Sequence, residues 1–179
     1  MTPATDWLLP DWPAPSRVKA CVTTRAGGVS LPPFDTFNLG DHVEDDLQAV
    51  THNRQCLSAR IDCAPAWLCQ VHGVVVADAD PASVAEADAS WTAKTGVACA
   101  VLTADCLPVL FCDRAGTRVA AAHAGWRGLA GGVLEATLAA LAVPASEVLV
   151  WLGPLSCGTS SVACSCRGTA VRAPLRGAG

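Results

Sequence analysis

One cysteine and two histidines lie beside short apolar segments whose length is typical of buried strands. Cys106 follows the segment 97–102, His123 follows 119–122, and His72 lies between two shorter segments. Two imidazoles and a thiolate suit zinc, and three protein ligands leave a fourth coordination position for water or substrate. The same side chains could instead make Cys106 a nucleophile and His123 its base, as in a hydrolase or an amidase. Both chemistries need the same atoms in one place, so these residues alone leave the choice open.

Charged residues next to this trio could assist either chemistry. Asp105 precedes the cysteine and could orient a ligand from outside the first coordination sphere. Arg127 stands four residues after His123, in a Gly-Trp-Arg-Gly turn that we expect to enter a helix. A helix start with an arginine suits a phosphate or a carboxylate. Arg25, in a glycine-bearing loop, is a second candidate for holding an anion.

The elements that must position these residues indicate a mixed α/β (α+β) protein with mixed β-sheets and flanking helices. Apolar runs, alternation and turn residues predict strands over 18–24, 66–71, 74–77, 97–102, 109–112, 119–122 and 148–152. Helical spacing predicts helices over 45–60 and 131–141. A turn is expected at 113–116, whereas the acidic, alanine-rich segment 78–95 is predicted to be irregular.

Composition excludes several classes of protein. The chain has 179 residues, 51% of them hydrophobic, which is enough for one domain with its own core. A formal net charge of −4 offers no basic surface for nucleic acid. Neither a signal peptide nor a membrane-spanning apolar run is visible, so we expect a cytoplasmic protein whose ten cysteines are mostly reduced.

The last 25 residues differ from the rest. Residues 155–179 contain no acid, three arginines and three cysteines, and they show no apolar period of either strand or helix. We therefore predict one domain over 1–154 and a poorly ordered tail over 155–179.

The motifs around Cys106 and His123 closely resemble a known family. They read Thr-Ala-Asp-Cys-Leu-Pro at 103–108 and His-Ala-Gly-Trp-Arg-Gly at 123–128. The likeness extends from about residue 7 to residue 154, with further matching motifs at 23–30, 37–40, 53–54, 70–73, 88–89 and 151–154. The chain thus resembles the laccase-domain family, first described as multicopper polyphenol oxidases. Its members are now viewed as purine nucleoside phosphorylases with adenosine deaminase activity, and some are named peptidoglycan editing factors.

This resemblance implies a zinc ion bound by His72, Cys106 and His123. It implies phosphate-dependent cleavage of adenosine, inosine, guanosine and methylthioadenosine to the base and ribose 1-phosphate, with deamination of adenosine as a side activity. Copper fits less well, because the chain lacks the several His-x-His pairs that multicopper centres need. The implied fold is shared with the cytotoxic necrotising factor toxins, where a Cys–His pair deamidates glutamine. An amidase of cell-wall precursors, working through Cys106, therefore stays open.

Further roles are hypotheses at this stage. We assign catalysis to Cys106, His123, His72 and Asp105. Small-molecule substrates, nucleoside and phosphate, are expected to meet Arg25, Asn38, Gln70 and Arg127: the arginines at phosphate, and Asn38 and Gln70 at the nucleoside. After Pro154 the continuation typical of the family is replaced, which suggests a frameshift in the coding sequence. An inactive, truncated copy is accordingly a third functional alternative.

Overall fold

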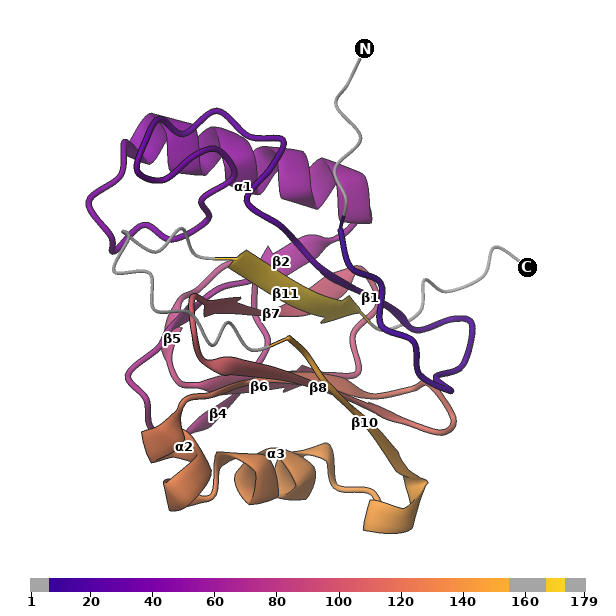
Figure 1. Ribbon diagram of the computed structural model, residues 1–179. Coiled ribbons are helices and arrows are strands. Elements are labelled where there is room, and N and C mark those ends of the chain that lie inside the picture. Colours follow the sequence, from indigo (N-terminus) through magenta and orange to yellow (C-terminus); the bar gives the residue numbers. More distant parts are fainter. Residues whose placement is uncertain (1–6, 155–166, 173–179) are drawn as a thin grey trace.

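The computed structural model describes residues 7–154 and 167–172, and its elements form four layers (Figure 1). Two β-sheets pack face to face in the middle. Helix α1 covers the outer face of one sheet, and α2 and α3 lie on the outer side of the other. The predicted class, mixed sheets with flanking helices, is confirmed.

The first sheet has the order β1-β11-β7-β2. Strand β11 runs antiparallel to both of its neighbours, whereas β2 is parallel to β7. The bounds are β1 Lys19–Val22, β11 Arg167–Arg172, β7 Val97–Thr103 and β2 Ala64–Ala66.

The second sheet has the order β10-β8-β9-β6-β4, antiparallel except for the β4–β6 pair. Two short strands, β3 and β5, pair in parallel beside the two sheets. The bounds are β10 Val148–Leu152, β8 Leu107–Asp113, β9 Val119–Ala124, β6 Ala89–Thr92, β4 Val76–Asp78, β3 Leu68–Cys69 and β5 Ala85–Glu86.

The helices follow their predicted positions with shifted boundaries. Helix α1, Leu47–Ile61, starts after Asp46, whose carboxylate accepts from the Gln48 amide and caps the first turn. The second predicted helix, 131–141, corresponds to α3 Val133–Leu141, and the turn that was expected to enter a helix begins a separate short helix, α2 Trp126–Gly131. Gly132 separates them with a φ of +96°, a conformation that glycine adopts without a steric penalty. A short 3₁₀ turn, Ala145–Glu147, precedes β10.

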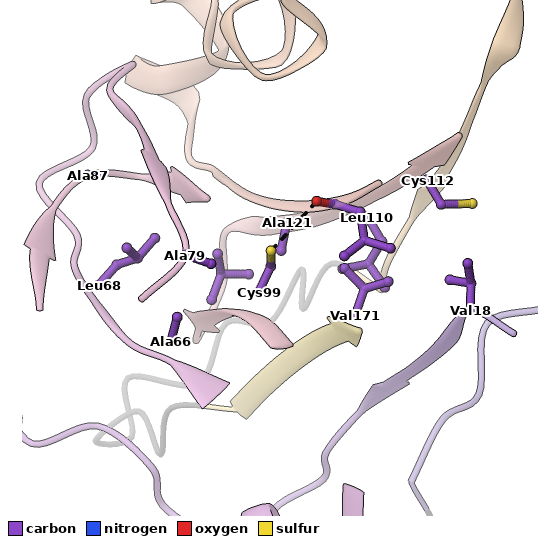
Figure 2. Packing of buried hydrophobic residues seen from close by; sticks show 12 residues of the cluster. Val18, Ala66, Leu68, Ala79, Ala87, Cys99, Leu110, Cys112, Ala121 and Val171 are labelled. Atoms are coloured by element: carbon purple, nitrogen blue, oxygen red, sulfur yellow. Dashed lines mark hydrogen bonds between the residues drawn. The ribbon is translucent and has the colours of Figure 1, made fainter. Parts of the chain in front are cut away.

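The alternation of side chains along β9 decides which way each residue points. Ala120 and Ala122 pack toward α3. Val119 and Ala121 face the other sheet and join the main core. Figure 2 shows Ala121 there with residues of β7, β8 and β11. His123 comes two residues after Ala121, so the same alternation turns it inward, at the end of the buried strand.

Two expectations about irregular segments are wrong in part. The segment 78–95 contains β5 and β6, strands of two and four residues that are held by pairing with β3, β4 and β9. Within the supposed tail, residues 167–172 form β11, with Val171 fully buried between the sheets. Such short strands carry little periodicity of their own, because their partners supply the backbone hydrogen bonds. The remaining tail residues, 155–166 and 173–179, lie outside the described part of the chain.

The predicted strand over 66–71 and the expected state of the cysteines can also be compared with the structure. The predicted strand over 66–71 is interrupted, since β2 ends at Ala66 and β3 covers only two residues. All seven cysteines in the described residues are free thiols. Within the described ranges, no helix is long and apolar enough to cross a membrane.

Candidate metal centre

The structure brings the three predicted ligands together. His72 lies in the loop between β3 and β4, Cys106 in the turn between β7 and β8, and His123 in β9. Their ligand atoms all lie within 4.8 Å of one another, and the Cys106 Sγ is 3.9 Å from the His72 Nε2. The two imidazole rings meet edge to face, with centroids 4.8 Å apart.

The pairing of β8 with β9 explains why the cysteine reaches this point. Leu107 is paired with Ala124, so the next residues outward, Cys106 and Gly125, lie opposite each other. A Cβ added at Gly125 would lie 3.0 Å from the Cys106 Sγ and 2.9 Å from the His72 Cδ2. Real Cβ atoms essentially never approach another atom to 2.9 Å, and a contact of 3.0 Å is unusually tight, so glycine keeps the space beside the ligands open.

A buried carboxylate, that of Asp88, forms hydrogen bonds to the residues that carry the candidate ligands. The Asp88 side chain, fully buried just before β6, accepts a hydrogen bond from the His123 Nδ1 at 2.8 Å. It also accepts from the backbone amides of three successive residues, Val71 at 3.1 Å, His72 at 2.9 Å and Gly73 at 2.6 Å. This carboxylate therefore touches two of the three segments that carry the candidate ligands, the His72 loop and the end of β9.

The ionisation of this pair prepares His123 as a ligand. Burial lowers the pKa of His123, although the neighbouring Asp88 acts in the opposite direction. Burial works to raise the pKa of Asp88, but the hydrogen bonds from His123 and from the three amides bring it below its usual value. A neutral imidazole with its proton on Nδ1 faces an ionised carboxylate, which leaves the Nε2 lone pair for a metal ion or a proton.

The surroundings of Cys106 favour a cation. Burial raises the pKa of the thiol, and the negative charges of Asp105 and Asp88 raise it further. A metal ion reverses this balance, because its own charge stabilises the thiolate. The donors are thus a sulfur and two nitrogens, the set that suits zinc. Because His72 is exposed, Cys106 half-buried and His123 buried, the group is open to solvent on one side.

Sequence reasoning missed Asp88 as a residue of this site and named Asp105 instead. Asp105 is exposed and acts on the neighbouring thiol. Asp88 is the residue that orients a histidine. The matching family motif at 88–89 was the available signal, but it fell in the segment that was predicted to be irregular.

The two predicted nucleoside contacts, Gln70 and Asn38, form hydrogen bonds within the chain itself. The Gln70 carboxamide exchanges two hydrogen bonds with the main chain of Leu102, at 2.8 and 2.7 Å, and so ties the His72 loop to the end of β7. Asn38 is fully buried, and its side-chain amide donates to the Gly40 carbonyl and to Asp45. Both side chains have a structural task in this conformation.

The two predicted phosphate-binding arginines differ in whether they bond to the chain's own backbone. Arg25 donates to the carbonyls of Pro33 and Asp35, both at 3.1 Å, and closes its own loop. Arg127 is exposed at the start of α2, two residues beyond Gly125, with its guanidinium 4.8 Å from the centre of the Trp126 ring. Of the two, Arg127 is the more exposed.

Comparison with known proteins identifies the family. The sequence profile of the family described as multi-copper polyphenol oxidoreductase laccase matches residues 19–165. The chain belongs to this family. The resemblance predicted from the motifs is thereby confirmed.

Named relatives and solved structures add detail. A purine nucleoside phosphorylase of Pseudomonas aeruginosa is 69% identical over 148 residues, which are 83% of this chain and 61% of the relative. One from Escherichia coli is 53% identical over 151 residues, covering 82% and 62%. The crystal structure of a Neisseria meningitidis protein superposes with a TM-score of 0.81 at 54% identity, covering 83% of this chain and 62% of that one. The chain thus spans about three fifths of the length of these relatives.

Proposed function

We propose that this protein is a zinc-dependent purine nucleoside phosphorylase. Its substrates would be adenosine, inosine, guanosine and methylthioadenosine together with phosphate, and the products would be the free base and ribose 1-phosphate. Deamination of adenosine would be a side activity, and the location cytoplasmic. The relatives that share most of this chain carry the name purine nucleoside phosphorylase, which supports the reaction class.

One observation carries the proposal. His72, Cys106 and His123 converge with ligand atoms within 4.8 Å of one another, and Gly125 leaves the space beside them open. Nitrogen and sulfur donors suit zinc, and bound zinc would supply a positive charge that polarises a substrate oxygen or lowers the pKa of a water molecule.

The chain's own residues would divide the remaining work. In phosphorolysis, a phosphate oxygen forms a bond to the ribose C1′ while the bond from C1′ to the base breaks, and the base leaves with a proton. Arg127 would hold the phosphate, because it is exposed directly beyond Gly125. His123 would be kept in one tautomer by Asp88. Gln70 would hold the His72 loop against β7.

A metal-free thiol mechanism is the second candidate. The 3.9 Å separation between the Cys106 Sγ and the His72 Nε2 favours it, with His72 as the base in place of the expected His123, because a nucleophile and its base must lie close together. An amidase of this kind would need neither phosphate nor zinc.

The test is the release of hypoxanthine from inosine, with and without phosphate, by the zinc-loaded chain and by Cys106→Ala. We expect release that requires phosphate, is abolished by a zinc chelator and returns when zinc is added. Cys106→Ala should reduce kcat/KM by more than the roughly 100-fold that loss of an outer hydrogen-bond partner costs a metal site.

Release that persists in the chelator would refute the zinc requirement, and release without phosphate would indicate hydrolysis in place of phosphorolysis. The thiol mechanism would instead be supported by metal-free amide hydrolysis that requires Cys106. A folded wild-type chain that releases no hypoxanthine with zinc and phosphate present would refute the proposed reaction and favour the inactive copy.

A further inference from the structure

The Asp88 carboxylate makes contact with both histidine-bearing segments of the candidate metal centre, the loop at 71–73 and the end of β9. We infer that Asp88 is the positioning residue of this centre: it holds both imidazoles in the arrangement that binds the metal, and so sets the affinity. The inference rests on the metal centre of the proposed function and adds a role for a residue that is not itself a ligand.

Asp88 forms two hydrogen bonds with His123. The His123 Nδ1 lies 2.8 Å from the Asp88 Oδ1, and the His123 backbone amide donates to the Asp88 carbonyl at 2.7 Å. Main chain and side chain of the same two residues are therefore joined, which fixes both the place of the ring and its rotation. With Nδ1 occupied, Nε2 is the nitrogen left for a metal ion.

The hold on His72 acts through the backbone. The amides of Val71, His72 and Gly73 all point at the Asp88 carboxylate. Three successive amides converge on one point because His72 has a φ of +61°, a left-handed conformation that is uncommon for a residue with a side chain. Such a concave group of amides binds anions. The negative charge of Asp88 thus stabilises the loop conformation that turns the His72 ring toward Cys106.

The fold offers a matched control. Asp113, 4% exposed at the far end of β8, also has its carboxylate filled by hydrogen bonds, from the Thr117 amide and hydroxyl and from the Arg118 amide. Asp88→Asn and Asp113→Asn therefore make the same chemical change in two buried carboxylates of the same sheet region. Only the first lies at the candidate ligands.

The experiment measures zinc affinity by competition with a chelator, in the full 179-residue chain and in both variants, with cobalt(II) absorption as a second readout. Asp88→Asn should bind zinc about 10- to 100-fold more weakly, the usual effect of removing an outer partner of a ligand. Its cobalt(II) bands should shift, because loosened histidines change the coordination geometry. Asp113→Asn should bind both ions as the wild type does, whatever its thermal stability.

Equal zinc affinity in Asp88→Asn and the wild type would overturn the inference, as would an equal loss in Asp113→Asn. A wild-type chain that binds neither zinc nor cobalt(II) would refute the zinc centre itself, whereas the first two results leave the proposed function standing.

If Asp88→Asn does not fold, nitrogen-15 NMR of the wild-type histidines decides. We expect His123 to carry its proton on Nδ1 before zinc is added and to bind zinc through Nε2. Zinc on Nδ1, or no proton there, would overturn the role of Asp88.

Discussion

Strands β8 and β9 run side by side, and a buried carboxylate lies near each end of the pair. At one end, Asp113 binds Thr117 and Arg118, donors four and five residues away in the same turn. At the other end, Asp88 binds donors 15 to 35 residues away, on loops from separate parts of the chain.

The two carboxylates therefore do different work with the same chemistry. Asp113 accepts hydrogen bonds only from backbone amides and a hydroxyl, and these bonds hold together the turn between β8 and β9. Asp88 also binds an imidazole whose second nitrogen remains available, beside a cysteine and a glycine that leaves space. A buried carboxylate can support a reactive centre when one of its hydrogen-bond donors is an imidazole, because the second ring nitrogen can bind a metal ion or a proton. Matched substitutions can test this contrast between the site end of the strand pair, next to Asp88, and the turn end, next to Asp113.

Of the substitutions that compare the two ends of the strand pair, Gly125→Ala beside the metal centre should have the largest effect. Gly125→Ala places a Cβ 3.0 Å from the Cys106 Sγ, although its extended backbone, with a φ of −68°, accepts any residue. Because the ligands must move, we expect kcat/KM for phosphorolysis to fall about 100-fold, as displacements of about 1 Å do at catalytic sites. Zinc content measured on the purified protein should fall as well.

The same substitution at the turn end is the control. Gly116 has a φ of +67°, and its added Cβ would lie 2.8 Å from the Arg17 side chain. Gly116→Ala should lower the free energy of unfolding by about 1–2 kcal/mol, the cost of a left-handed conformation, and leave zinc content unchanged. Loss of zinc from Gly116→Ala alone would contradict the contrast.

An intermediate effect is expected from the exposed arginine beyond the site end. Arg127→Ala should raise the KM for phosphate about tenfold, because a hydrogen bond to a charged group contributes about 1.5–3 kcal/mol. Arg114→Ala, an exposed arginine at the turn end, should leave this constant unchanged. Arg25→Ala should raise the KM for phosphate less, since Arg25 already bonds to its own loop. A larger increase for Arg25→Ala would reverse the assignment.

The smallest effect on the site is expected from Asp113→Asn, which should act on stability alone. The pKa of Asp113 is lowered, since hydrogen bonds from Thr117 and Arg118 outweigh the opposing effect of burial. The folded state thus holds the carboxylate more strongly than the unfolded one does. Its contribution is fully present above the unfolded pKa of about 3.9 and is lost as the pH falls through the folded pKa.

Urea unfolding at a series of pH values checks this. Asp113→Asn should be about 1–3 kcal/mol less stable at neutral pH, and the difference from the wild type should shrink as the pH falls below about 4. A difference that stays constant with pH would show that the charge of Asp113 is not what closes the turn.

The local sequence was sufficient for much of the molecule. The strands β7, β8, β9 and β10 follow from their apolar runs, and the turn at 113–116 from an Asp and a Gly that bond within a few residues. The placement of Cys106, His123 and His72 beside such runs sufficed to predict that they meet, because strand ends and their loops gather at the edges of a sheet.

Contacts between distant segments decided the rest. The short strands β5, β6 and β11 exist through their partners. Gln70 is held by a backbone 32 residues away, so its amide, a plausible nucleoside contact by residue type, serves the fold. Asp88 became part of the site only when the loop at 71–73 and the end of β9 closed around it. Residue type defines which bonds a side chain can form, but burial and register decide which partner is within reach.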